Sequence, residues 1–405
     1  MMAVKAPVKA PANVPVWMIG RIDQFRILAT HLTRNNRLAR WDSFWRHNGH
    51  GLITPPARKV DPILASIPGR HLLPDLLGKT AQKLHLPARN LYSDLPLSWL
   101  AATHMPDAKI LHGQGNYSLP AMRRARTKGM AIISDITGQL APIRKKQLAD
   151  EYHHHGLRYR EISNLLARRR MAEARFADGV FAPSDAVAAG LVDCGINASR
   201  IHLVPFTSSL CDPLLAYDHG PSATSDDGTT HLLYVGNIAI AKGIRILIEA
   251  FRVLRHRLGP AITLSLVGPA HPCALAYLAK LPPGCVWQGP VTHKHLPDHL
   301  LSADIFVFPS LSEGSSLAVL EAMAASCAVI TTPDAGSPIT HNQNGILIPP
   351  RDSEALINAI TDLHADPVKR TTLGRAARQV IAHDIADDYG TRVEAAYEKV
   401  LTRHG

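Results

Sequence analysis

Two glutamates separated by seven residues stand where an apolar helical pattern begins in the second half of the chain. Pro309–Ala324 reads PSLSEGSSLAVLEAMA, with Glu313 in a Ser/Gly loop and Glu321 inside the helix that follows. Backbone N–H groups at a helix start, together with the helix dipole, attract a phosphate. Carboxylates nearby accept hydrogen bonds from the hydroxyl pairs of a sugar or a ribose. This chemistry suits a ligand in which a phosphate is joined to a sugar.

The helix is expected to begin near Ser315 or Ser316, because serine is a favoured N-cap residue. The backbone N–H groups of Ser315, Ser316 and Leu317 would then point toward the anion. Glu321 is followed by the apolar run Ala-Met-Ala-Ala, where an unpaired carboxylate is costly, and this favours a ligand or a partner for it. The competing interpretation places both glutamates on the solvated surface.

A lysine at another helix start provides a cation. Leu232–Phe251 reads LLYVGNIAIAKGIRILIEAF, in which a strand ends at Gly236 and the pair Lys242, Gly243 opens a helix. The positive end of the helix dipole repels a lysine at that place unless the side chain reaches an anion such as a diphosphate. A solvated loop lysine is the simpler alternative.

Short apolar runs alternate with helical patterns in both halves of the chain, which predicts two doubly wound α/β domains with parallel sheets. The stretch 217–230 is rich in Gly, Ser, Thr and Asp, as is typical of a linker. No strand can be assigned in 30–105. The expected strands are Pro15–Ile19, Ala108–Leu111, Met130–Ile133, Gly179–Ala182, Ile201–Val204, Leu232–Val235, Ile262–Val267, Val286–Trp287, Asp304–Phe308, Ala328–Thr331 and Gly345–Ile348.

The composition is globular, with 405 residues of which 46% are hydrophobic and 19% charged. An odd number of cysteines, five, without a CxxC argues against a disulfide framework or a zinc site and fits a reducing cytosol. Positive charge is concentrated in residues 1–216, which hold 29 Lys and Arg against 15 Asp and Glu. Such a field attracts phosphates, an anionic membrane or nucleic acid. Nucleic acid is disfavoured, because no aromatic residues are interleaved with the basic runs.

The two loop–helix segments resemble those of the retaining GT-B glycosyltransferases of family 4, also called the group 1 type, and the resemblance extends over about residues 105–400. The further segments that carry it, in chain order, are Asp107–His112, Phe176–Ser184, Leu266–Gly268, Gln288–Val291, Ala303–Ser310, Asn344–Pro350 and Tyr397. The resemblance implies an α/β fold of the GT-B type. Two doubly wound Rossmann-like domains would face a central cleft, and a C-terminal helix would return to the first domain.

The domain division predicted on this basis assigns the acceptor to the first Rossmann-like domain and the nucleotide-sugar to the second. Its parts are a flexible lead-in at 1–15, the first domain at 16–216, the linker at 217–230, the second domain at 231–384 and the crossing helix at 385–405.

The resemblance also implies roles for individual residues. Glu321 would bind the ribose of a nucleotide-diphosphate-sugar, Glu313 would hold hydroxyls of the transferred sugar, and Lys242 would stabilise the leaving diphosphate. No metal or other cofactor is expected, because the lysine and the helix start supply the positive charge. Further donor contacts are implied for Gly236, Asn237, Val291, Gly314, Ser315, Ser316 and Leu317.

The chain departs from the family pattern at several places, and two of them concern the predicted site. Asn237 stands where the family has an arginine, and Arg245, one helical turn beyond Lys242, either substitutes for it or faces solvent. Asp135 or Thr137 stands where the family has a first-domain histidine. Asp135 is interpreted as a catalytic residue whose carboxylate accepts a hydrogen bond from a hydroxyl of the donor or the acceptor. The alternative is that Asp135 caps a helix.

The implied function is transfer of a sugar, with retention, from a nucleotide-diphosphate-sugar to a glycan or lipid-linked acceptor in cell-envelope or exopolysaccharide biosynthesis. The enzyme would be cytoplasmic, peripheral on the inner face of the membrane through its basic first domain, and would not bind nucleic acid. The alternative is a degenerate GT-B fold that acts as a binding or scaffold protein. Asn237 favours that alternative, whereas the presence of Glu313, Glu321 and Lys242 opposes it.

Overall fold

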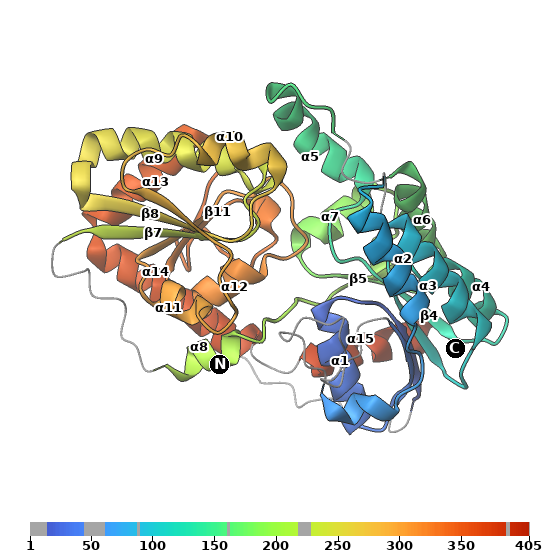
Figure 1. Cartoon of the computed structure of the whole chain (residues 1–405). Coiled ribbons are helices and arrows are strands. Elements are labelled where there is room, and N and C mark those ends of the chain that lie inside the picture. Colours follow the sequence, from blue (N-terminus) through green and yellow to red (C-terminus); the bar gives the residue numbers. More distant parts are fainter. Residues whose placement is uncertain are drawn as a thin grey trace.

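The computed structural model describes residues 14–43, 61–86, 90–159, 163–217, 228–385 and 389–404. They form two parallel six-stranded sheets, with strand orders β2-β1-β3-β4-β5-β6 and β12-β11-β10-β7-β8-β9, which Figure 1 shows in two separate halves of the molecule. The strands are β1 (Val16–Ile19), β2 (Leu38–Asp42), β3 (Ile110–Gln114), β4 (Ala131–Asp135), β5 (Gly179–Ala182), β6 (Ile201–Leu203), β7 (Thr230–Val235), β8 (Ile262–Val267), β9 (Cys285–Gly289), β10 (Ile305–Phe308), β11 (Ala328–Thr331) and β12 (Ile346–Leu347).

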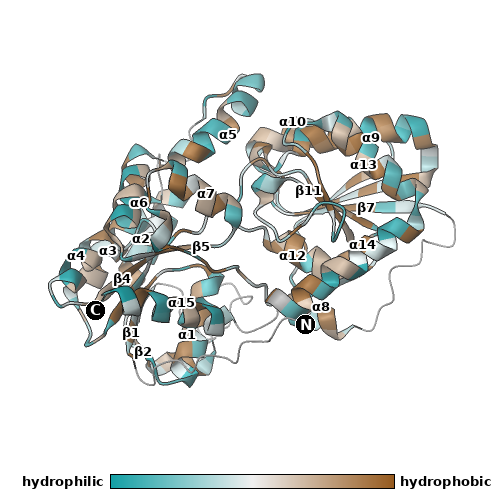
Figure 2. Cartoon of the chain, turned by 180° about the vertical axis from the view of Figure 1, so that it is seen from behind, coloured by the Kyte–Doolittle hydropathy of each residue, from teal (hydrophilic) through white to brown (hydrophobic). Residues whose placement is uncertain are grey.

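The central strands are buried along their whole length, because helices cover both faces of each parallel sheet. Figure 2 shows the apolar stretches of β4 and β11 in brown inside their domains. All eleven predicted strands are confirmed, three of them with the predicted bounds. The α/β fold with two doubly wound domains is therefore confirmed. The structure adds β2, which the sequence did not predict.

Helices lie between the strands of each sheet. The α-helices are α1 (Asp23–Arg34), α2 (Leu72–Lys83), α3 (Leu91–Thr103), α4 (Leu119–Arg126), α5 (Ala141–His154), α6 (Asn164–Phe176), α7 (Asp185–Asp193), α8 (Cys211–Ala216), α9 (Ile244–Leu258), α10 (Leu275–Leu278), α11 (Leu296–Leu301), α12 (Leu317–Ala324), α13 (Ser353–Ala365), α14 (Pro367–Val380) and α15 (Tyr389–His404). None of the helices in the described ranges combines the length and the apolarity that a membrane crossing requires.

The C-terminal helix α15 returns to the first domain, as predicted. It packs against α1, and Tyr389 and Tyr397 enter the first-domain core with Val393. Arg37 Nη1 lies 2.7 Å from Glu394 Oε1, an ion pair that ties α15 to the edge of the first sheet. Figure 1 shows α15, in red, beside the blue α1. The first and the last helix that the structure describes are thus joined in one domain.

The chain crosses between the domains before the predicted linker. Phe206 belongs to the first-domain core, whereas Cys211 and Leu214 of α8 belong to the second-domain core. The division at 216 places α8 in the first domain, but the helix packs on α12 of the second. Most of the lead-in (1–13) and of the linker (218–227) lies outside the described residues.

Candidate active site

Strands β7 and β10 are neighbours in the second sheet and mark the point where the strand order reverses. From β7 the chain continues outward through β8 and β9, and from β10 it continues in the other direction through β11 and β12. Loops that leave such neighbouring strands at their carboxyl ends diverge and open a crevice, the usual ligand site of doubly wound sheets. The loops after β7 and β10 carry the two predicted phosphate-binding segments, so the topology brings these segments together.

Lys242 and Glu313 form an ion pair across this crevice. Lys242 ends a short 3-10 turn after β7, and Glu313 lies in the loop after β10. Their side chains are 21% and 18% exposed, so a ligand can reach both. The two residues are 71 positions apart in the chain, and the structure places them in direct contact.

Gly243 allows the two loops to approach. Its φ of 70° lies in the left-handed region, and a Cβ atom at this position would overlap the carbonyl oxygen of Pro309. The residue directly follows Lys242 and is the N-cap of α9, which confirms the predicted helix start. The backbone of one loop therefore touches the other only because a glycine stands here.

The predicted helix start is confirmed, with Ser316 as the N-cap of α12. The N–H of Ser316, however, donates to the carbonyl of Ala335 at 3.1 Å, and the N–H of Glu313 donates to Asp334 at 2.9 Å. The anion-binding donors expected at this helix start are thereby reduced to the N–H groups of Ser315 and Leu317. The bonds made by Glu313 and Ser316 hold the loop in place against the segment after β11.

The other residues predicted to contact the donor lie on loops at the same carboxyl edge of the sheet. Gly236 directly follows β7, and the carbonyl of Asn237 accepts a hydrogen bond of 3.0 Å from the Tyr234 hydroxyl. Val291 follows β9 and packs, half-buried, on the second-domain core. Arg245 does not replace the missing arginine. Its guanidinium is bound to both carboxylate oxygens of Glu151, at 2.8 and 3.0 Å.

Glu321 is buried in α12, and its carboxylate accepts a hydrogen bond of 2.5 Å from the Ser208 hydroxyl. Ser208 lies in the segment that crosses between the two cores, so this bond connects the helix to the crossover. Burial raises the pKa of Glu321 to about 7, although the Ser208 hydrogen bond favours the charged form. The sequence predicted burial and a partner for this carboxylate, and the structure supplies Ser208 as the partner.

The raised pKa of Glu321 predicts a pH-dependent stability that glutamine should remove. The folded protein holds a proton at Glu321 that the unfolded chain releases above the ordinary value of 4.5. The free energy of unfolding should therefore fall as the pH rises from about 4.5 to about 7, by up to about 3 kcal/mol from this group alone. In Glu321→Gln this contribution to the fall in the free energy of unfolding should vanish. Urea denaturation at about pH 5 and about pH 7.5 would measure the fall in each protein. The exposed Glu354→Gln is the control, and equal slopes in both variants would contradict the prediction.

Asp135 lies at the end of β4, but its carboxylate is engaged within the first domain. Its Oδ2 is 3.1 Å from His112 Nε2, and His112 Nδ1 is 2.7 Å from the Tyr397 hydroxyl. All three side chains are almost fully inaccessible. The network joins two strands of the first sheet to α15. Asp135 forms no helix cap, whereas the backbone carbonyl of Thr137, two residues further on, lies close to Gly314 of the second domain.

The loop of Glu313 is also where the two domains meet. The Ser184 hydroxyl donates to the Gly314 carbonyl at 2.6 Å, and the Ser312 hydroxyl donates to Gln147 at 2.6 Å. A Cβ atom on Gly314 would overlap the carbonyl oxygen of Thr137. Arg144 donates to the Ser312 carbonyl at 3.2 Å. First-domain groups therefore surround the loop that carries one of the predicted catalytic residues.

The first sheet has its own reversal point between β1 and β3, and polar residues gather there to which the sequence analysis gave no role in a site. The N–H of Arg21 donates to Gln114 at 2.9 Å, and its guanidinium lies over the Tyr117 ring, 5.2 Å from the centroid. Arg170 donates to the Asn116 side chain at 3.3 Å. Arg21 and Gln114 both lie just at or after a strand end, and that position was the signal available in the sequence.

A cavity of about 430 Å³ lies between the domains. Ser315 is the one predicted site residue on its wall. The lining residues are Pro183, Ser184, Asp185, Ala186, Leu203, Pro205, Phe206, Ser315, Leu320, Pro333, Gly336, Ser337, Pro338, Ile339, Leu347 and Ile385. They come from both domains and from both crossovers, so the volume of this cavity depends on how the domains are placed.

Known proteins resemble the chain in both sequence and fold. Residues 229–366 match the family model described as Glycosyl transferases group 1. A D-inositol 3-phosphate glycosyltransferase from Pseudarthrobacter chlorophenolicus is 31% identical over 52% of this chain and 54% of its own length. A putative teichuronic acid biosynthesis glycosyltransferase, TuaC, from Bacillus subtilis is 32% identical over 41% of this chain and 38% of its own. The matches thus span about half the length of these relatives or less.

Solved structures match nearly the whole chain. HepE from Anabaena, solved with UDP, superposes with a TM-score of 0.65 at 15% identity, covering 96% of this chain and all of that one. Sucrose-phosphate synthase from Thermosynechococcus elongatus gives 0.66 at 20% identity with the same coverage. The chain therefore has the GT-B fold of these proteins, and its second domain carries the sequence signature of the group 1 glycosyl transferases.

Proposed function

We propose that this chain is a retaining glycosyltransferase of family 4 that uses a nucleotide-diphosphate-sugar donor. The contact between Lys242 and Glu313, beside the start of α12 and in the crevice between β7 and β10, is the observation that carries the proposal. A cation, a carboxylate and the positive end of a helix dipole converge there, which suits a diphosphate joined to a sugar. The group 1 match over 229–366 covers all of these groups.

Each group has one task in the proposed reaction. Without donor, Lys242 and Glu313 neutralise each other, and a bound diphosphate would replace Glu313 as the anion beside Lys242. Glu313 would then hold hydroxyls of the sugar. The bond between the anomeric carbon and the diphosphate oxygen breaks while the acceptor oxygen attacks from the same face, and the acceptor proton leaves with the nucleoside diphosphate. Lys242 stabilises the charge that develops on the leaving group, and no metal is required.

The acceptor is proposed to bind at the first-domain crevice, beside Arg21, Tyr117 and Arg170. Its class is a glycan or a lipid-linked saccharide of cell-envelope or exopolysaccharide biosynthesis. TuaC, one of the relatives, is named for teichuronic acid biosynthesis, which supports this choice. The excess of basic residues in 1–216 supports a cytoplasmic enzyme that is peripheral on the anionic inner face of the membrane.

A thermal-denaturation panel with UDP, GDP, ADP and their sugar conjugates tests the proposed donor site. A ligand that binds only the folded protein stabilises it by about 2.7 kcal/mol at a hundredfold excess over its Kd. One nucleotide family should raise the melting temperature of the wild type, and the rise should be smaller in Glu321→Ala, whose ribose contact is lost. Glu321→Gln provides a variant with less disturbance of the core.

The exposed glutamate Glu354, in the first turn of α13, gives the control Glu354→Ala, which should respond like the wild type. Absence of a shift with every nucleotide would overturn the transferase proposal. The scaffold interpretation of the same fold would then be the one to pursue.

A further inference from the structure

Helix α2 exposes its leucines to solvent. Leu72, Leu73, Leu76 and Leu84 are 59%, 55%, 58% and 62% exposed, and Leu77 is also exposed. The side chains that α2 buries are Pro74 and Ala81. A surface helix normally places its leucines against the core and its polar residues outside. Here the distribution is reversed, and the four most exposed leucines with Leu77 are called the leucine face below.

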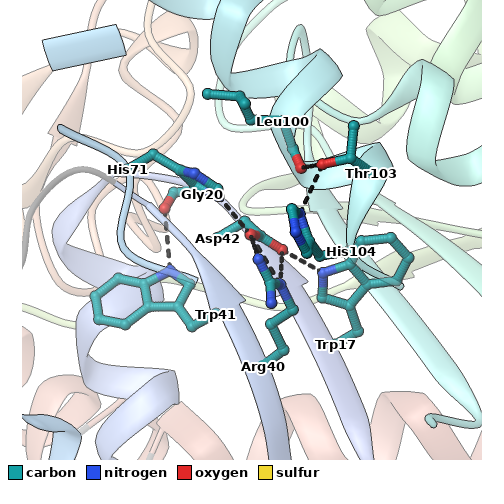
Figure 3. Close-up of polar contacts among 9 residues, drawn as sticks. All are labelled: Trp17, Gly20, Arg40, Trp41, Asp42, His71, Leu100, Thr103 and His104. Carbon is teal, nitrogen blue, oxygen red and sulfur yellow. Dashed lines mark hydrogen bonds and ion pairs between the residues drawn. The ribbon is translucent and has the colours of Figure 1, made fainter. Parts of the chain in front are cut away.

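The leucine face is not a consequence of a loosely held helix. Figure 3 shows Asp42, fully buried, with Trp17, Arg40 and His71 around it. His71 is the N-cap of α2, and its Nε2 lies 2.7 Å from Asp42 Oδ1. The start of α2 is therefore fastened to the first sheet by a buried carboxylate.

The side of α2 opposite the leucine face packs on α3. A Cβ atom on Gly78 would lie 2.9 Å from the Ser93 Cβ, so the two helices are in close contact there. Pro74, Gly78 and Ala81 follow the spacing i, i+4 and i+7, which is one side of a helix. The leucines occupy the other side, so the orientation of α2 fixes their exposure. Trp99 on the outer side of α3 is 65% exposed as well.

Cations surround the leucine face. The segment 70–85 contains Arg70, Lys79 and Lys83 against one acid, Asp75, and it also contains two histidines. Lys79 Nζ lies 2.6 Å from Asp75 Oδ2, so the acid is paired within the segment and the net charge of the remaining Lys and Arg residues is positive. On the other side of α3, helix α4 exposes three arginines, of which Arg124 donates to the carbonyl of Ala102 on α3. An apolar helix face bordered by Lys and Arg is typical of helices that lie in the interface of an anionic bilayer.

The size of the leucine face also favours a membrane over a protein partner. A helix of twelve residues is about 18 Å long and about 10 Å wide, which is far below the ~800 Å² per partner of a stable protein interface. In Figures 1 and 2, α2 lies nearer to the second domain than α3 and α4 do. A surface bound to α2 would therefore lie on the side of the first domain from which an acceptor could reach the crevice between the domains.

We propose that α2 is a membrane-docking helix, whose leucine face enters the interface of an anionic bilayer while Arg70 and Lys83 meet lipid phosphates. The inference rests on the proposed function in one respect, because that function places the enzyme at an anionic membrane. The binding itself requires neither donor nor acceptor.

Sedimentation with lipid vesicles tests the proposal on the full chain. Vesicles of phosphatidylcholine alone are compared with vesicles that also contain phosphatidylglycerol. The wild type should bind the anionic vesicles. The affinity of the triple variant Leu72→Ser, Leu73→Ser, Leu76→Ser for these vesicles should be lower by about tenfold or more. The matched control is Leu275→Ser, Val286→Ser, Val368→Ser, which removes three apolar side chains, each more than half exposed, from the second domain and should bind like the wild type.

Three results would overturn the proposal. The first is absence of wild-type binding to the vesicles, and the second is equal binding by the two triple variants. The third is a wild-type dimer that becomes monomeric in the α2 variant, which would identify the leucine face as a contact between two copies. Nucleotide-dependent thermal shifts of the same variants separate the two proposals. A normal shift without vesicle binding refutes the membrane-docking helix alone, whereas vesicle binding without any shift refutes the donor site alone.

Discussion

Replacing Lys242 by alanine is expected to lower the rate of sugar transfer by about 10²- to 10³-fold, the usual cost of removing one group that stabilises developing charge. The leaving diphosphate gains negative charge as its bond to the sugar breaks, and Lys242 is the cation that contacts the site carboxylate Glu313. Because both side chains are partly exposed, the carboxylate left without its partner can be hydrated. The variant should therefore fold normally.

The measurement is release of nucleoside diphosphate from the donor that the binding panel identifies. Lys242→Arg keeps the charge and should recover part of the rate, although the planar guanidinium does not fill the same space. Lys280→Ala, an exposed lysine of the same domain, is the control for a general loss of charge. A transfer rate in Lys242→Ala equal to that of this control would remove the lysine from the mechanism.

The strands could be predicted because parallel strands covered on both faces are continuous apolar runs, and β5, β8 and β11 agree with the prediction residue for residue. The unpredicted strand β2 lies at an edge and reads LARWD. Its charges are satisfied only in the folded protein, where Arg40 binds Asp42 and the neighbouring Arg37 binds Glu394. Glu394 is 357 positions away from Arg37, so no local pattern indicates the pairing of these two residues.

Helix α2 was missed for a related reason. Its leucines suggest a core, but they face outward, while Pro74 and Gly78 are residues that usually argue against a helix. Of the three residues on the packing side, only Ala81 is a good helix former, and none has the large apolar side chain that marks a buried face in a sequence. Sequence patterns predict an element best when its large apolar side chains form the buried side, whereas in α2 they form the exposed side.

The site shows a similar division between local and tertiary information. The loops of Lys242 and Glu313 could be located from the sequence, because each follows a strand and opens a helix. The sequence could not show that Asp135 faces His112, since a neighbouring strand and α15 decide where that carboxylate points. Nor could it show that Ser208 binds Glu321, 113 positions further along the chain. In both cases the partner comes from a separate element, and the contact exists only in the folded protein.

Replacing Gly314 by alanine is expected to separate the two domains at the Glu313 loop. The new Cβ would overlap the Thr137 carbonyl oxygen and lie 2.8 Å from the Gly138 Cα, and both are backbone atoms that cannot rotate away. Moving an aligned reacting group by about 1 Å can cost about 10² in rate. Transfer should therefore fall by about 10²-fold, whereas nucleotide binding, which belongs to the second domain, should be retained. Small-angle scattering should show a larger radius of gyration.

Gly138→Ala is a matched control, because it adds the same methyl group to the other side of the same contact. A Cβ on Gly138 would have the Gly314 nitrogen, at 3.9 Å, as its nearest neighbour, which is ordinary van der Waals contact. This variant should transfer sugar at the wild-type rate. If Gly314→Ala also retained that rate, the contact between the Thr137 and Glu313 loops would not be part of the reacting state. If Gly314→Ala lost nucleotide binding together with transfer, the added methyl group would have damaged the donor site itself. A loss of transfer with nucleotide binding retained is the result that identifies a role for this contact in bringing the acceptor domain to the sugar.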